Sequence, residues 1–394
     1  MMGRQAEAAL RLFMADANAA GGTQIAGLRH EIALECIDDE GKRGRAAEIY
    51  RELINRRIDV LFGPYSSTLA RAAASVAEQA GMLFINHGGA DDDLYRSGYR
   101  LIVGVLTPAS EYMTEFVRLA ATLKLWRKRL AIVSSAAPFA HAVVEGSERA
   151  CTERLARRRG VRLRVKYNGR FEPENAGPRL HRVLRRNRVN VLMSAGSYAH
   201  DLAVMRFATS ESLNIPMLGC VAAGVNRFLY DMGHAAEGVV GTAQWEPDVE
   251  VRPTLGPTPL EFVHRMRAVG AGEPDYPAAQ AYAAGLLTLA AARQAESLDP
   301  RQIRKAFSDL RVSTFFGDFA IDQETGRQLG HKMVLVQWHA GRKVIINPEP
   351  ELGSGELEFP SGWRLLLAAM QMLRITRHDE GDGEEDESRN PPEM

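Results

Sequence analysis

The stretch of residues 58–90 most strongly constrains what this chain can fold into, because it reads as strand, turn, helix, strand and glycine turn. Its two apolar runs, Ile58–Phe62 and Met82–Ile85, are separated by an alanine-rich helical segment. Small and hydroxyl-bearing residues follow both runs, namely Ser66, Ser67, Gly88, Gly89 and Ala90. Loops that follow parallel strands meet at one edge of the sheet, where open α/β sheets bind ligands. The pattern therefore predicts a binding crevice at that edge.

The chemistry of this crevice follows from the helix that begins after Ser66. Free N–H groups and the positive end of the helix dipole favour a carboxylate or another anionic or carbonyl oxygen. The alternative is structural: Ser66 and Ser67 cap the helix, and Gly88-Gly89 only makes a turn. We favour a binding role because the two loops follow successive strands.

Length and charge narrow the class of protein and of partner. A chain of 394 residues exceeds one ordinary hydrophobic core, so two α/β domains are expected. Lys plus Arg equals Asp plus Glu, at 49 each, so no overall field attracts nucleic acid or an acidic membrane. The arginine-rich segments 154–164 and 179–188 lack interleaved aromatics and are interpreted as a solvated face. A neutral or zwitterionic small molecule is the expected partner.

Motifs for catalysis, metals and nucleotides are absent from the sequence. It holds no GxxxxGK[ST], GxGxxG, HExxH or GxSxG pattern, so no cofactor, metal site or catalytic residue is predicted. The cysteines Cys36, Cys151 and Cys220 lack zinc or disulfide spacing. A cleft enzyme would have to use Ser66, His87 or His200, and we expect no enzyme. No run of 18 apolar residues and no signal peptide is visible.

Alternating strand and helix patterns predict parallel sheets with crossover helices. The strand-like runs are His30–Ile37, Val60–Phe62, Met82–Ile85, Arg100–Val105, Leu130–Ser134, Val161–Tyr167 and Val189–Met193. Helical patterns cover 4–20, 43–56, 69–80, 109–123, 140–157, 177–186, 260–268, 277–295 and 300–310. The sequence pattern changes at three places, near Leu106–Pro108, Thr242–Pro253 and Phe315–Gly317. We interpret these as three crossings of the chain between two lobes, which together form a hinge.

These crossings divide the chain into two discontinuous lobes and a C-terminal extension. The first lobe comprises 1–106 and 248–314, and the second comprises 107–247 and 315–360. Residues 361–377, which include Trp363, have a helical pattern too short to span a bilayer. The acidic tail 378–394 is expected to be disordered.

Four segments resemble a known family in the same order along the chain. They are IDVLFGPYSS from Ile58, HAAEGVVGTAQW from His234, DYPAAQAYAAG from Asp275 and FFGDFAIDQETGRQLGHKMVLVQW from Phe315. Together they resemble the leucine/isoleucine/valine-binding family, the type I periplasmic solute-binding proteins of ABC transporters. The resemblance implies two Rossmann-like lobes that close on a ligand by hinge motion. Amide-sensing regulators of amidase operons share that fold.

The resemblance also implies roles for individual residues. Ser66 and the backbone of Gly88 and Ala90 match the positions that bind a ligand carboxylate, with Gly89 in the same loop and Ser67 a partial substitute. Phe139 would stack on the ligand, Ser194 and Ala195 would line the cleft, and Tyr276 would add a wall contact.

Two departures from the family qualify these expectations. The loop Gly219–Gly224 holds no acid to pair with a ligand ammonium, so an ordinary amino acid is doubtful unless Asp201 reaches in. A carboxylate, amide or aromatic acid fits better. The chain also begins at the helix 4–20, without the family's first strand. A misplaced start or a truncation, which would also remove a signal peptide, is expected.

The leading hypothesis is a periplasmic or extracellular binding protein that delivers a small ligand to the membrane subunits of an ABC permease. The alternative is a cytoplasmic ligand-sensing regulator whose Trp363 helix and acidic tail contact a partner; this applies if the start is genuine.

Overall fold

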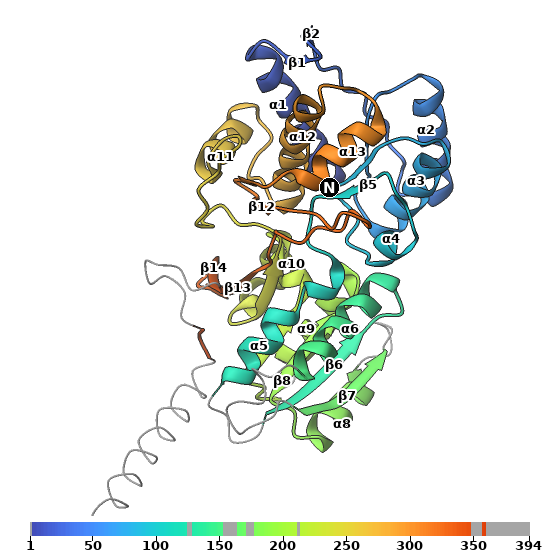
Figure 1. The fold of residues 1–394 in the computed structure, drawn as a ribbon. Helices are drawn as coiled ribbons and strands as arrows, with labels where there is room; N and C mark the ends of the chain where they lie inside the picture. Colours follow the sequence, from blue (N-terminus) through green and yellow to red (C-terminus); the bar gives the residue numbers. More distant parts are fainter. Residues whose placement is uncertain are drawn as a thin grey trace, which may run out of the picture.

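The computed structural model describes residues 2–123, 128–152, 164–170, 177–210, 213–347 and 357–359. Figure 1 shows two lobes stacked on one another, with the chain passing between them at the centre. The first lobe holds α1 (Met2–Ala19), β1 (Thr23–Ile25), β2 (Leu28–His30), α2 (Arg43–Asn55), β3 (Leu61–Phe62), α3 (Ser67–Gln79), β4 (Phe84–Asn86), α4 (Asp93–Arg96), β5 (Ile102–Gly104), α11 (Pro259–Ala268), α12 (Tyr276–Ala295), α13 (Pro300–Asp309), β11 (Val312–Thr314) and β12 (Gly317–Phe319).

The second lobe is built on a larger sheet. Its elements are η1 (Ala109–Glu111), α5 (Thr114–Thr122), β6 (Arg129–Ser134), α6 (Pro138–Thr152), β7 (Arg164–Arg170), α8 (Gly177–Arg186), β8 (Val191–Ala195), α9 (Tyr198–Ser210), β9 (Met217–Cys220), η3 (Val221–Gly224), α10 (Arg227–Met232), η4 (Gly233–Ala236), β10 (Val240–Ala243), β13 (Val334–His339) and β14 (Arg342–Asn347). The α/β class predicted from the sequence is confirmed. The predicted helix 361–377, the tail 378–394 and arginines 154–162 lie outside the described residues.

Both sheets place loops at the junction of the lobes. In the first lobe, β3, β4 and β5 are parallel and adjacent in that order. In the second, the order is β14-β13-β10-β9-β8-β6-β7, with the five strands from β10 to β7 parallel and the hairpin β13-β14 added antiparallel at one edge. The βα loops of both sheets therefore follow the carboxyl ends of parallel strands, as the crevice prediction requires.

The predicted strand His30–Ile37 is wrong in extent. Only Leu28–His30 forms a strand, paired antiparallel with β1, whereas residues 31–39 have no regular secondary structure. The side-chain amide of Asn18 accepts the N–H of Ile32 and donates to its carbonyl, each at 2.9 Å. Among the described residues no neighbouring strand pairs with this segment, and a strand without a partner cannot satisfy its backbone groups.

The third crossing also lies further along the chain than the sequence indicated. Residues after Phe315–Gly317 remain with the first lobe: Gly104 donates its N–H to the carbonyl of Gly326 at 2.8 Å, and Arg304 donates to the carbonyl of Gln323 at 3.0 Å. The chain enters the second lobe only before β13. The predicted position followed a change of sequence character, which marked the hairpin β11-β12 rather than a crossing.

Aromatic side chains anchor the second crossing to the helices of the first lobe. Trp245 is 1% exposed, and its ring packs edge-on against Phe262 and Phe315, which stack on each other with centroids 4.3 Å apart. The indole N–H of Trp245 donates to the carbonyl of Phe315 at 2.9 Å. A fourth ring, Tyr282 of α12, packs on Phe262 and Phe315. Trp245, Tyr282 and Phe315, which come from three of the four segments quoted from the sequence, thus belong to one core.

Buried hydrogen bonds join the three crossings to one another. The Gln244 amide accepts the N–H of Thr107 at 3.0 Å and donates to its carbonyl at 2.9 Å. The Thr107 hydroxyl lies 2.6 Å from Nδ1 of His331, and Nε2 of His331 lies 3.1 Å from the carbonyl of Phe316. We call Thr107, Gln244 and His331 the hinge triad. Since one residue comes from each crossing, the triad links all three crossings at one place.

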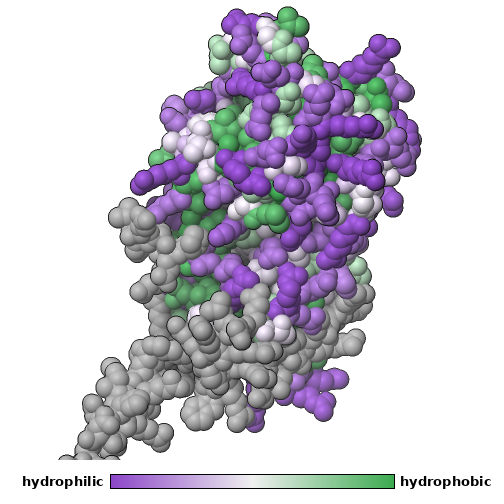
Figure 2. All heavy atoms as spheres, viewed as in Figure 1, coloured by the Kyte–Doolittle hydropathy of each residue, from purple (hydrophilic) through white to green (hydrophobic). Residues whose placement is uncertain are grey.

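The described surface on the face seen in Figure 2 is mostly hydrophilic, with hydrophobic residues in small groups. No helix among the described residues has the length and apolar character needed to cross a membrane.

His331 makes stability depend on pH. Burial lowers its pKa to about 4, against an ordinary value of 6.5. As the pH falls from 6.5 to 4 the unfolded chain takes up this proton while the folded chain does not, so up to roughly 3 kcal/mol of stability is lost in that range. We expect His331→Gln to melt lower at pH 7.5 but to lose less stability between pH 7.5 and 4.5 than the wild type.

The free energy of unfolding is measured by urea denaturation across this pH range. The control variant is His264→Gln, since His264 is exposed on α11. Parallel pH profiles for the wild type and His331→Gln would contradict the assignment.

Candidate functional site

The loops after β3 and β4 lie against each other. The N–H of Ser66 donates to the carbonyl of Gly88 at 3.2 Å. A Cβ atom on Gly88 would lie 2.4 Å from the carbonyl oxygen of Pro64, so only glycine permits this approach. We call the residues 64–67 and 87–90 the cradle. The structure therefore brings together Ser66, Ser67, Gly88, Gly89 and Ala90, which the sequence assigned to two separate loops.

Ser66 is in an unusual conformation. Its φ is 128°, in the region that favours glycine, and such backbone strain typically costs about 1–3 kcal/mol. Its hydroxyl accepts the N–H of Leu69 at 3.4 Å, so Ser66 is the N-cap of α3. The capping interpretation is thus correct, although a 3.4 Å bond is long. Strain at a residue beside free helix N–H groups is typical of ligand-binding loops.

Asn86 holds the second cradle loop in place. Its side chain is fully buried, accepts the N–H of Gly89 at 2.9 Å and donates to the carbonyl of Gly89 at 2.7 Å and to the hydroxyl of Tyr95 at 2.9 Å. The neighbouring His87 is 2% exposed, and burial lowers its pKa to about 4. His87 is therefore neutral at physiological pH. Asn86 shapes the turn, which the sequence analysis attributed to glycine alone.

Aromatic residues flank the cradle. The hydroxyl of Tyr276, the first residue of α12, lies 2.6 Å from that of Tyr65. Phe139, in the first turn of α6, is half-buried and packs edge-on against Tyr112 with centroids 5.3 Å apart. The hydroxyl of Tyr112 accepts from the amide of Gln244 at 3.0 Å. The predicted Phe139 and Tyr276 thus come with tyrosine partners that the sequence analysis missed.

Ser194 and Ala195 lie inside the sheet of the second lobe. Both are fully buried in β8, and the hydroxyl of Ser194 donates to the carboxylate of Asp201 at 2.8 Å. Asp201, also fully buried, accepts the N–H of Ala222 at 3.0 Å. Ser194 and Asp201 therefore support the loop after β9. Asp201 is fully buried and holds these bonds inside the second lobe, away from the surface that a ligand would meet.

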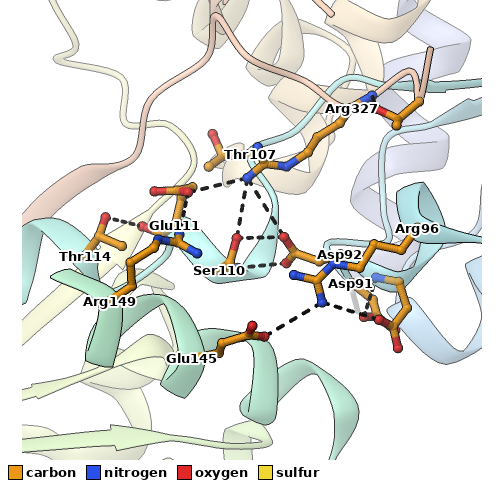
Figure 3. Close-up of polar contacts among 12 residues, drawn as sticks. Asp91, Asp92, Arg96, Thr107, Ser110, Glu111, Thr114, Glu145, Arg149 and Arg327 are labelled. Carbon is orange, nitrogen blue, oxygen red and sulfur yellow. Dashed lines mark hydrogen bonds and ion pairs between the residues drawn. The ribbon is translucent and has the colours of Figure 1, made fainter. Parts of the chain in front are cut away.

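Charged side chains extend from the cradle across the lobe junction (Figure 3). Asp92 follows the cradle; it is 4% exposed and accepts both the N–H of Ser110, at 2.9 Å, and its hydroxyl, at 2.6 Å. Arg327 lies 3.4 Å from the carboxylate of Glu111, which Arg149 of α6 also contacts at 3.0 Å. The cradle is thus tied through the first crossing to the second lobe.

A cavity of about 260 Å³ opens where α4 faces α6. Arg96 of the first lobe lies 3.7 Å from Glu145 of the second at this place (Figure 3). The cavity is lined by Asp91, Asp93, Arg96, Ala136, Pro138, His141, Ala142 and Glu145. Asp91 follows Ala90 of the cradle and Pro138 precedes Phe139, so the cavity adjoins both segments of the chain, although neither the cradle residues nor Phe139 line it.

The family model for periplasmic binding proteins matches residues 1–343. The chain belongs to the periplasmic binding protein family. This confirms the family suggested by the sequence, and three solved structures show the same fold.

The family's solved structures are similar along most of their length. An ABC transporter substrate-binding protein from Desulfitobacterium hafniense, complexed with Leu, is 19% identical, with a TM-score of 0.71 and coverage of 86% of this chain and 95% of its own. The branched-chain amino acid binding protein LivJ from Streptococcus pneumoniae, complexed with isoleucine, is 16% identical, with a TM-score of 0.73 and coverage of 91% and 95%. A solute-binding protein from R. palustris, complexed with benzoate, is 17% identical, with a TM-score of 0.68 and coverage of 88% and 91%.

In this periplasmic binding protein, some residues around the candidate site were not identified by the sequence analysis. Tyr65, Tyr112 and Gln244 had no spacing signal, because their partners lie far away in the sequence. Tyr65 and Gln244 were nevertheless accessible to prediction, since Tyr65 lies inside the GPYSS turn and Gln244 inside the HAAEGVVGTAQW segment. Among the described residues no group of three or more His, Cys, Asp or Glu side chains is arranged to hold a metal ion.

Gly88→Ala tests the contact between the cradle loops. The added Cβ would clash with Pro64 and Tyr65, so we expect a loss of about 1–3 kcal/mol in urea denaturation. The matched control is Gly44→Ala in α2, where a Cβ meets no atom within 4 Å and a gain of up to about 1 kcal/mol is expected. Equal effects of the two changes would show that the loops are not closely packed.

Proposed function

We propose that this protein is the solute-binding component of an ABC transporter and binds a small carboxylate or amide without an ammonium group. The observation that carries the proposal is the cradle itself: two closely packed loops at the N-terminus of α3, next to an interlobe cavity lined by Asp91 and Pro138. A carboxylate at this place would accept hydrogen bonds from Ser66 and from backbone N–H groups. Closure of the second lobe would then exclude water.

The described residues of the second lobe support a ligand that has no ammonium group. The loop Val221–Gly224 carries no acid, and Asp201, the acid considered from the sequence, is fully buried and bonded to Ser194 and Ala222. A ligand ammonium buried there would lack a counter-ion, at a cost of several kcal/mol. Phe139 and Tyr112 instead offer an apolar and aromatic wall, which suits an aliphatic or aromatic acid or amide.

The location, the partners and the absence of catalysis follow from this proposal. A solute-binding component works outside the cytoplasmic membrane and delivers its ligand to the permease subunits, with no cofactor and no catalysis. The enzyme alternative gains nothing from the geometry, since Ser66, His87 and His200 make no hydrogen bond with one another among the described residues. The regulator alternative depended on residues 361–394, which lie outside the described part of the chain.

Ligand-dependent melting tests the proposal. We expect benzoate, 4-methylpentanoate or isobutyramide to raise the melting temperature more than leucine does. Ser66→Gly removes the hydroxyl but relieves the strained φ, so it should keep stability and lose at least about tenfold in affinity for the stabilising ligand.

The matched control is Thr258→Ala, which removes the N-cap of α11 far from the cradle. It should lose about 1 kcal/mol of stability and no affinity. The proposal fails if none of these acids and amides shifts the melting temperature, or if Ser66→Gly binds as the wild type does.

A further inference from the structure

A buried cluster of charges joins the two lobes at the start of α12, next to Tyr276. The ammonium of Lys343 in β14 is bonded to the carboxylate of Glu246, lies 4.0 Å from that of Asp275 and donates to the carbonyl of Gly224 at 3.0 Å. The three charged side chains are only 7–8% exposed. We call Lys343, Glu246 and Asp275 the buried charge cluster.

The cluster touches the elements that form the site. Asp275 is the N-cap of α12 and precedes Tyr276, whose hydroxyl contacts that of Tyr65 in the cradle. The other oxygen of Asp275 accepts the N–H of Asn226 at 3.0 Å. Gly224 and Asn226 belong to the second-lobe loop that carries no acid of its own. Glu246 of the second crossing and Asp275 of the first lobe therefore add carboxylates next to that loop, besides Asp201 of the second lobe.

The buried charge cluster contains two acidic side chains and one basic side chain, that of Lys343. Two carboxylates face one ammonium, and buried ions of this kind are costly unless paired. Burial raises the pKa of Glu246 to about 7, although the positive charge of Lys343 acts in the opposite direction. The two acids therefore form a cation-binding pocket, and the protein fills it with a side chain of its own.

We propose that Lys343 is a specificity-determining residue, whose ammonium occupies the acidic pocket of Glu246 and Asp275 and so excludes ligands that carry their own ammonium group. This inference rests on the proposed function and extends it to the chemistry of the ligand. An incoming α-ammonium would meet a buried positive charge where it needs a negative one. An otherwise identical acid without that group meets no such repulsion.

The test compares leucine with 4-methylpentanoate, which differs from leucine only in lacking the ammonium. Isothermal titration is performed on the full chain at pH 8.5, where Glu246 is ionised and alkylammonium groups remain charged. The wild type should prefer 4-methylpentanoate. In Lys343→Ala the preference should move toward leucine by at least about tenfold, because the pocket then lacks a cation.

A second measurement tests, without any organic acid, whether a cation binds between Glu246 and Asp275. Ethylammonium should raise the melting temperature of Lys343→Ala but not that of the wild type or of Lys305→Ala, a control at an exposed position of α13. Sodium at equal concentration should have no such effect. If Lys343→Ala does not fold, Lys343→Met keeps most of the aliphatic stem and takes its place in the leucine comparison.

The possible results separate the two proposals. If no acid binds the wild type, the proposed function fails, while the ethylammonium measurement still decides whether the pocket holds a cation. An unchanged ratio of affinities in a folded Lys343 variant, or no ethylammonium effect in Lys343→Ala, would overturn the role of Lys343.

Discussion

The structure depends first on the hydrogen bonds of the hinge triad. Thr107, Gln244 and His331 join three chain segments that would otherwise be independent linkers between the lobes. Each is 6% exposed or less, so the bonds form away from water, where an unmade partner costs about 1–3 kcal/mol. They hold the first crossing in register with the second, and Asp92 then ties the cradle to Ser110 just beyond Thr107. The position of the cradle relative to the second lobe follows from this junction.

Two sets of charged side chains between the lobes differ in burial, and they therefore differ in how much they contribute to stability. Arg96 and Glu145 are 55% and 50% exposed, so their pairing contributes at most about 1 kcal/mol and is screened by salt. This pair cannot by itself hold the lobes together. The buried charge cluster is shielded from water, so removing one partner is far more costly. The exposed pair therefore contributes little to holding the lobes together, whereas the buried charge cluster is a fixed contact between them.

The sequence predicted the local parts of the fold well and the crossings less well. Local sequence patterns located α2, α11 and α12 to within one residue at either end. The helices α2 and α11 are amphipathic, whereas α12 is an alanine-rich helix that is buried over most of its length. The strand predicted at His30–Ile37 fails, since a strand needs a partner that periodicity does not reveal. The third crossing fails for a similar reason: only the bonds of Gly326 and Gln323 to the first lobe show where that chain segment lies.

The sequence by itself determined the α/β class, the family and the cradle, because these depend on apolar runs and on residues a few positions apart. Ser66 and Gly88 could be named from the strands that precede them. Only the tertiary structure decided which distant groups meet. Thr107 lies 137 residues from Gln244 and 224 from His331, and Lys343 lies 97 from Glu246. Such pairs form when the chain crosses between the lobes, and no local spacing records that crossing.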